Sequence, residues 1–348
     1  MAEVAVEPFG TLEGRTIQLT RLRTSSGFSL EVIDYGATVR SLVVRAGDIQ
    51  RDIVLGLDDL DAYLKNTVFL GGIVGRFANR VGNSSFELDG RTYKLFPSDP
   101  PHHLHGGKRG WDKVVWSSEA HATDTEATVV LRYRSADQEE GYPGNVSAEV
   151  IYGLTEAGEF TVTMRATTDR KTYVSMAQHN YYNLKGPGAG STLDHEITLF
   201  ADEYTPPSAS GVPDGRIASV ALGPLDFRQR RVHGSRLSEL GGEKPGYDHN
   251  FVVRGAPSEL RKVAEVREPA SGLTMLLEAN QPGVQFYSGQ FLDGSLRGKG
   301  GVLGPHSGLC LETQAFPNAV NVPAWAGQAL LEPGQTYEHR MVHRFFVS

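Results

Sequence analysis

Residues 1–348 are predicted to form a single all-β domain, and one large antiparallel β-sandwich is the simplest architecture, with a β-barrel as the alternative. Candidate segments are short, alternate between apolar and polar side chains, and are rich in β-branched and aromatic residues, as half-buried strands are. The 40 glycines and 18 prolines supply the turns that many antiparallel strands require. The clearest such segments, in chain order, are Phe28–Asp34, Thr128–Arg134, Phe160–Ala166, Gly272–Ala279 and Tyr337–Val347.

Helical patterning is brief and no linker divides the chain. A short helix is expected around Asp58–Lys65, where Asp58 or Asp59 can act as N-cap. The small-residue stretch Gly186–Thr192 and the segment Pro206–Gly215 are interpreted as surface loops, because strand-like patterning continues on both sides of the first without a change of composition. No fixed-period repeat is found.

Composition excludes several classes of function. The net charge of -7 and the lack of a basic tract argue against a nucleic-acid partner, since such binding depends on neutralising phosphates. No stretch approaches the roughly 20 apolar residues of a membrane-spanning helix. The beginning of the chain lacks the positive charge and apolar core of a signal peptide. A single cysteine fits a reducing compartment, so a cytoplasmic protein is expected.

The strongest local anomaly is a carboxylate inside an apolar segment, Leu309–Gln314. Alternation places Cys310, Glu312 and Gln314 on one face of this strand. A buried carboxylate is costly unless it is paired or used, whereas a solvent-facing glutamate on a half-exposed strand would need no explanation. The residues alone leave both interpretations open. The apolar neighbours of Cys310 favour an inert buried thiol over a nucleophile.

Three histidines in four positions follow Pro101, ending at His105. Imidazole is a common metal ligand, yet this spacing is a weak signal and no acidic residue lies beside it to complete a ligand set. We therefore predict no metal, and a loop in which one histidine orients a group and the others are exposed.

A second polar cluster lies in Ser175–Leu184, where an extended strand would place His179, Tyr181 and Asn183 on one face. An imidazole, a phenol and an amide together could line a site for a polyhydroxylated ligand, although a lone histidine in such a strand is more often a hydrogen-bonded structural residue. Asp248 precedes an apolar run, where a turn or cap role is the simpler interpretation.

The glycine-rich segments Gly71–Arg80 and Gly298–Gly304 do not form a phosphate loop. Neither has the Gly-Lys-Ser/Thr ending, and no βαβ context surrounds them. A nucleotide site is therefore not expected.

Taken in order, these motifs resemble those of the aldose 1-epimerase (galactose mutarotase) family over nearly the whole chain. The matching segments are GGIVGRFANR at 71–80, HHLHGG at 102–107, GYPGN at 141–145, QHNYYNL at 178–184, YDHNF at 247–251, VQFYSG at 284–289 and HSGLCLETQAFPNAVN at 306–321. The resemblance implies a single β-supersandwich. It implies Glu312 as catalytic base, His179 as catalytic acid and His105 as a second active-site histidine, without metal or organic cofactor. It further implies sugar-hydroxyl contacts from Asn79, Arg80, Asp248 and Gln285.

The implied reaction interconverts the α and β anomers of free hexoses such as glucose and galactose. A base takes the C1 hydroxyl proton, an acid protonates the ring oxygen, and rotation about C1–C2 precedes reclosure. At their ordinary pKa values, glutamate is ionised and histidine can donate and recover a proton near neutral pH. Tyr182 or Phe286 could cover an apolar sugar face. Expected partners are a small aldose, no nucleic acid and no membrane, with a monomer or weak homodimer.

The chain departs from the family pattern at Gln178, Tyr182 and Asn318, which we expect near the site lining. None of the three replaces a proton-transfer residue. Three other functions stay open: a glycoside hydrolase using Glu312 and Asp248, an epimerase of phosphorylated hexoses, and a non-catalytic sugar-binding module.

Overall fold

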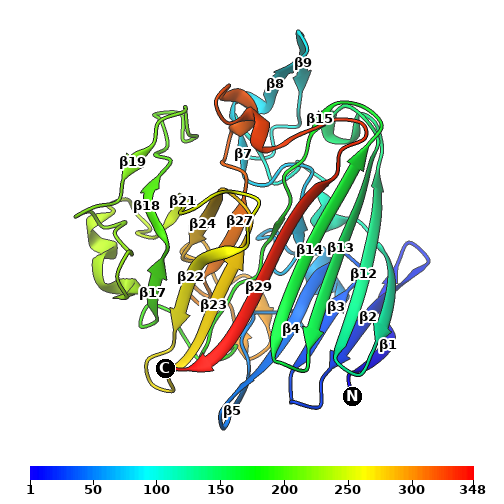
Figure 1. The fold of residues 1–348 in the computed structure, drawn as a ribbon, viewed down its shortest axis with the longest axis vertical. Helices are drawn as coiled ribbons and strands as arrows, with labels where there is room; N and C mark the ends of the chain where they lie inside the picture. Colours follow the sequence, from blue (N-terminus) through cyan, green and yellow to red (C-terminus); the bar gives the residue numbers. More distant parts are fainter.

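The computed structural model describes all residues from Met1 to Ser348 and confirms the all-β prediction. The largest sheet has nine strands, and Figure 1 shows the C-terminal strand, drawn in red, running between a green strand, Glu159–Thr168, and a yellow strand, Leu273–Ala279. In spatial order the strands are β11 (Ser117–Ala122), β12 (Glu126–Ser135), β13 (Val146–Thr155), β14 (Glu159–Thr168), β29 (Tyr337–Val347), β23 (Leu273–Ala279), β22 (Arg261–Arg267), β17 (Glu196–Leu199) and β20 (Arg231–Val232).

Two five-stranded sheets accompany it, and all neighbouring strands within the three sheets are antiparallel. The N-terminal sheet contains β1 (Glu3–Leu12), β2 (Arg15–Arg23), β3 (Ser29–Ile33), β4 (Thr38–Ala46) and β5 (Ile49–Asp52). The other contains, in spatial order, β19 (Ala218–Ser219), β18 (Ala201–Tyr204), β21 (Asp248–Val253), β24 (Gly283–Tyr287) and β27 (Cys310–Gln314).

Short two-stranded pairs complete the structure, and the pair β8–β9 projects from one end of the molecule (Figure 1). The pairs are β6 (Ile73–Val74) with β16 (Ala177–Gln178), β7 (Arg80–Val81) with β10 (His103–Leu104), β8 (Ser85–Leu88) with β9 (Arg91–Lys94), β15 (Thr172–Tyr173) with β28 (Leu330–Leu331), and β25 (Arg297–Gly298) with β26 (Gly301–Val302).

The predicted helix is confirmed as α1 (Leu60–Leu64). Asp59 is its N-cap, and its side chain accepts a hydrogen bond of 2.9 Å from the backbone N–H of Ala62. No helix has the length and apolar character that a membrane crossing requires. The 3₁₀ turns are η1 (Gly82–Ser84), η2 (Trp111–Lys113), η3 (Glu139–Gly141), η4 (His233–Glu239), η5 (Ala319–Asn321) and η6 (Ala326–Gln328).

The main core contains 54 buried apolar residues, from Ala2 near the N-terminus to Met341 in the last strand. It lies between the sheets because β4 packs against β29 and β2 packs against β12. The fold therefore buries one face of the N-terminal sheet against the nine-stranded sheet, as the sandwich prediction requires. The single-domain boundary, residues 1–348, stays a prediction.

Strand β27 is the element on which the site depends, and all five of its residues are buried. It pairs with β24 on one side and packs against β16. Glu312 is only 2 % exposed, so the solvent-facing interpretation of this carboxylate is wrong.

Candidate active site

One strand and two segments that directly follow strands, all distant in sequence, bring the predicted catalytic residues together. Glu312 lies in the middle of β27, His179 follows β16 directly, and His105 follows β10 directly. The turn at His105 has a positive φ of 50°. The next residue, Gly106, has a φ of 88°, and a Cβ there would lie 1.8 Å from the carbonyl oxygen of Gly75, so only glycine fits.

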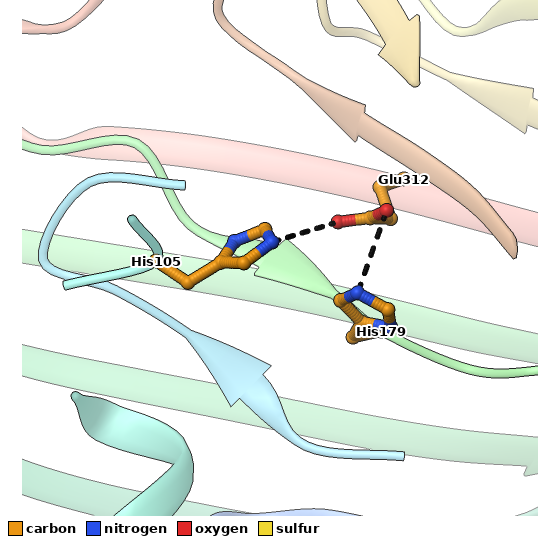
Figure 2. A group of neighbouring side chains, drawn as sticks. All are labelled: His105, His179 and Glu312. Carbon is orange, nitrogen blue, oxygen red and sulfur yellow. Dashed lines mark ion pairs between the residues drawn. The ribbon is translucent and has the colours of Figure 1, made fainter. Parts of the chain in front are cut away.

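Figure 2 shows Glu312 facing both imidazole rings. The Oε1 atom of Glu312 lies 3.6 Å from Nε2 of His179, and Oε2 lies 4.0 Å from Nε2 of His105. Both distances exceed a hydrogen bond, and Oε2 of this buried carboxylate has no hydrogen-bond partner in the protein. The carboxylate and the two imidazoles face one another without forming hydrogen bonds, so their polar atoms are available to a polar ligand.

Burial shifts the pKa values of the predicted catalytic residues away from the ordinary values assumed in the sequence analysis. It raises the pKa of Glu312 well above its ordinary value, an effect that the negative charge of Asp248 reinforces. It lowers the pKa of His179 to about 4 and holds that of His105 well below its ordinary value. Burial therefore favours the neutral forms of Glu312 and His179, so the expectation of an ionised glutamate beside a histidine of ordinary pKa is corrected.

The tautomer of His105 follows from its hydrogen bond. The backbone N–H of Asn79 donates to Nδ1 of His105 at 3.1 Å, so the ring proton lies on Nε2, which faces Glu312. The ligand atoms of His105, His179 and Glu312 lie within 4.8 Å of one another, close enough for a metal ion. A metal on Nε2 would have to displace the only ring proton of His105 and leave a buried imidazolate, which argues against such a site.

These groups line a cavity of about 210 Å³. Aromatic rings form much of its wall, and the ring centroid of Phe69 lies 4.6 Å from that of His105 and 5.8 Å from that of His179. The lining residues are Thr67, Val68, Phe69, Asn79, Arg80, Leu104, His105, His179, Tyr181, Asp248, Tyr287, Phe291 and Glu312.

Polar contacts connect the lining residues Arg80 and Asp248 to each other and to neighbouring side chains. Nε of Arg80 donates to Asp99 at 2.7 Å, and the same guanidinium lies 3.9 Å from Asp248. Nε2 of Gln285 donates to Asp248 at 2.7 Å. Of the four residues predicted to contact hydroxyls, Asn79, Arg80 and Asp248 line the cavity. Gln285 is not among the lining residues; it lies opposite Glu312 in the β24–β27 register, and its predicted contact with a sugar hydroxyl stays a prediction.

The predicted strand through His179 is shorter than expected, because β16 ends at Gln178. His179 and Tyr181 still line the cavity together, but Asn183 does not. Its side-chain amide donates to the carbonyl oxygens of Gly190 and Ser307, both at 2.9 Å, so it holds neighbouring loops instead.

The other two histidines of the 102–105 motif are buried rather than exposed, which corrects the prediction for that loop. Nε2 of His102 bonds the carbonyl oxygen of Ser210 at 2.6 Å, and Nδ1 of His103 bonds that of Phe96 at 2.8 Å. Both hold the loop that presents His105.

Neither Tyr182 nor Phe286 lines the cavity, and the aromatic wall consists of other residues. Sequence reasoning missed Phe69, Tyr287 and Phe291, although Tyr287 lies inside one of the matching motifs. Gln178, Tyr182 and Asn318, where the chain departs from the family pattern, are not themselves lining residues, but Gln178 and Tyr182 are chain neighbours of the lining residues His179 and Tyr181.

The fold and site define a sugar-epimerase type of protein, and comparison with known proteins makes this specific. The family model described as aldose 1-epimerase matches residues 18–344, so the chain belongs to the aldose 1-epimerase family. Galactose mutarotase of Bos taurus is 41% identical over 97% of this chain and 95% of its own length. Aldose 1-epimerase of Escherichia coli (strain K12) is 32% identical over 96% of each chain. A solved GalM/aldose epimerase homologue from C. elegans superimposes with a TM-score of 0.86 at 26% identity, covering 94% of this chain and 98% of that one.

Proposed function

We propose that this protein interconverts the α and β anomers of free hexoses such as glucose and galactose, with Glu312 and His179 as the proton-transfer pair. The observation that carries the proposal is a buried carboxylate facing two imidazole Nε2 atoms inside a small cavity. A monomeric or weakly dimeric state in the cytoplasm is part of the same proposal.

Ring opening moves one proton from the C1 hydroxyl to Glu312 and one from His179 to the ring oxygen. The pair therefore carries one proton throughout. With cyclic sugar bound, Glu312 is ionised and His179 is protonated; with the open-chain sugar, both are neutral. Burial favours the neutral forms of both residues, which is the proton distribution of the open-chain complex. A sugar hydroxyl that donates to the carboxylate favours its charged form and starts the reaction.

His105 acts as a fixed donor rather than as a second acid. Its Nδ1 already accepts a hydrogen bond from the backbone N–H of Asn79, so a proton on Nδ1 would place two N–H donors face to face and break that hydrogen bond. Its Nε2–H can hold the sugar oxygen that becomes negatively charged as the ring opens. Holding the substrate this way places the reacting atoms against Glu312.

The cavity charges favour neutral aldoses over phosphorylated ones. Asp248 and Glu312 both line the cavity, and the single lining cation, Arg80, is already engaged by Asp99. A phosphate group would meet two carboxylates without a free cationic cluster. Asn79, Arg80 and Asp248 remain for the hydroxyl groups, with Gln285 orienting Asp248.

The test is polarimetry of the wild-type protein on freshly dissolved α-D-glucose, α-D-galactose and glucose 6-phosphate. We expect faster mutarotation of one or both free hexoses, and much weaker acceleration for the phosphate. A chromogenic glycoside serves as a control, because an epimerase releases no aglycone whereas a hydrolase does. Sugar binding without acceleration of any aldose would show a binding module and refute the proposal.

A further inference from the structure

The single cysteine of the chain contacts the catalytic imidazole. Cys310 Sγ lies 3.7 Å from Nδ1 of His179, and both side chains are buried. Cys310 shares its face of β27 with Glu312, two residues further on. Burial raises the pKa of the thiol, and the charge of Glu312 adds to this, so the sulfur is a neutral thiol, which can accept a hydrogen bond.

The two site histidines differ in what faces their Nδ1 atoms. If His179 exchanges a proton through Nε2, its other ring nitrogen must keep a proton in both states and needs an acceptor. The sulfur of Cys310 can be that acceptor. At His105 the same position faces the N–H of Asn79, a donor, which fixes the opposite tautomer.

We propose that Cys310 is a positioning residue for proton transfer: its sulfur accepts the Nδ1–H of His179 and keeps the Nε2 lone pair directed at the reacting oxygen atoms. The proposal rests on the proposed function and adds a residue to it. It also explains why His179, rather than His105, is the histidine that gains and loses a proton. The thiol does not touch the substrate, since it lies outside the cavity lining.

The first test reads the tautomers directly and does not depend on activity. The protein is labelled with ¹⁵N-histidine, and the imidazole nitrogens are observed by NMR near pH 7, with the signals assigned from His179→Gln and His105→Gln variants. We expect neutral His179 to carry its proton on Nδ1 and His105 to carry it on Nε2. A wild-type His179 with its proton on Nε2 would overturn the proposal, whether or not the protein accelerates mutarotation.

The second test compares Cys310→Ala with Cys310→Ser, two small replacements that differ mainly in the hydroxyl acceptor. Losing one hydrogen bond corresponds to a fall in kcat of about three- to ten-fold. We expect this fall, with KM unchanged and a mixture of His179 tautomers, in the alanine variant only. The serine variant should retain the Nδ1–H tautomer and most of the rate. Equal loss in both variants, or wild-type kcat in the alanine variant, would refute the role.

Discussion

Acidification should destabilise this protein through its buried histidines. Burial lowers the pKa to about 4 at His103, His179 and His343, and to about 3 at His233 and His339. A histidine of the unfolded chain titrates near pH 6.5, at about its ordinary pKa. Between these values the unfolded state binds more protons than the folded state. The stability contributed by each neutral ring is therefore present above about pH 6.5 and is lost as the pH falls toward the folded pKa.

His343 allows the effect to be measured for one group. Its ring is buried, with Nε2 3.1 Å from the Tyr182 hydroxyl and Nδ1 3.2 Å from the Phe160 carbonyl oxygen. Because its pKa in the folded state is about 4, His343 should lower the free energy of unfolding by roughly 2 kcal/mol between pH 7 and pH 5. In His343→Gln, a polar side chain that does not titrate replaces it.

The assay is urea unfolding at pH 7 and at pH 5, compared as a difference within each variant. We expect the decrease in unfolding free energy between the two pH values to be about 2 kcal/mol smaller in His343→Gln than in the wild type. His121→Gln is the matched control, because the side chain of His121 is 57% exposed, and it should behave like the wild type. An unchanged pH difference in His343→Gln would refute the reasoning.

Three further predictions concern the cavity wall and the buried carboxylate. Phe291→Ala should raise KM severalfold at nearly constant kcat, because this ring, which is 53% exposed, lines the cavity. Phe96→Ala removes a ring of similar exposure, 44%, that lies outside the cavity lining, and should change neither constant. Asp99→Asn should also raise KM, because Arg80 loses the charge that orients it; steady-state polarimetry that finds both constants unchanged would show that this pair is unimportant. Glu312→Gln should raise the melting temperature at pH 7 but not at pH 4. The raised pKa of Glu312 destabilises the folded state once the pH exceeds the ordinary pKa of a glutamate, by about 1.4 kcal/mol for each unit of the pKa shift, and glutamine removes this cost. An equal effect of the substitution at both pH values would contradict the raised pKa.

Strong two-residue periodicity made much of the fold predictable. The segment Tyr337–Val347 is a strand with the predicted bounds, and Phe160–Ala166 lies within β14. The segment Leu309–Gln314 is a strand from Cys310 onward, but both of its faces are buried. Alternation identifies opposite faces of a strand and cannot tell which of them another element covers. This is why the residues alone could not decide whether Glu312 was buried.

The site residues could be predicted only where they lie in a segment that matches a family motif. The matching segments identified Glu312, His179 and His105, whereas Phe69 and Phe291 enter the cavity from loops with no local signal. The tautomer of His105 depends on the backbone of Asn79, 26 residues earlier. Shifts in pKa likewise arise from burial by distant elements, so ordinary values were the only ones that sequence reasoning could use.

The most direct test of the central claim is the mutarotation rate of Glu312→Gln on α-D-glucose or α-D-galactose, followed by polarimetry against the wild-type protein. Glutamine keeps the size and polarity of the side chain but cannot take the C1 hydroxyl proton. A positioned acid–base group typically supplies about 10²–10⁴-fold. We therefore predict that the variant loses most of the acceleration while remaining folded. A folded Glu312→Gln protein that mutarotates these sugars at wild-type rates would contradict the assignment of Glu312 as the base.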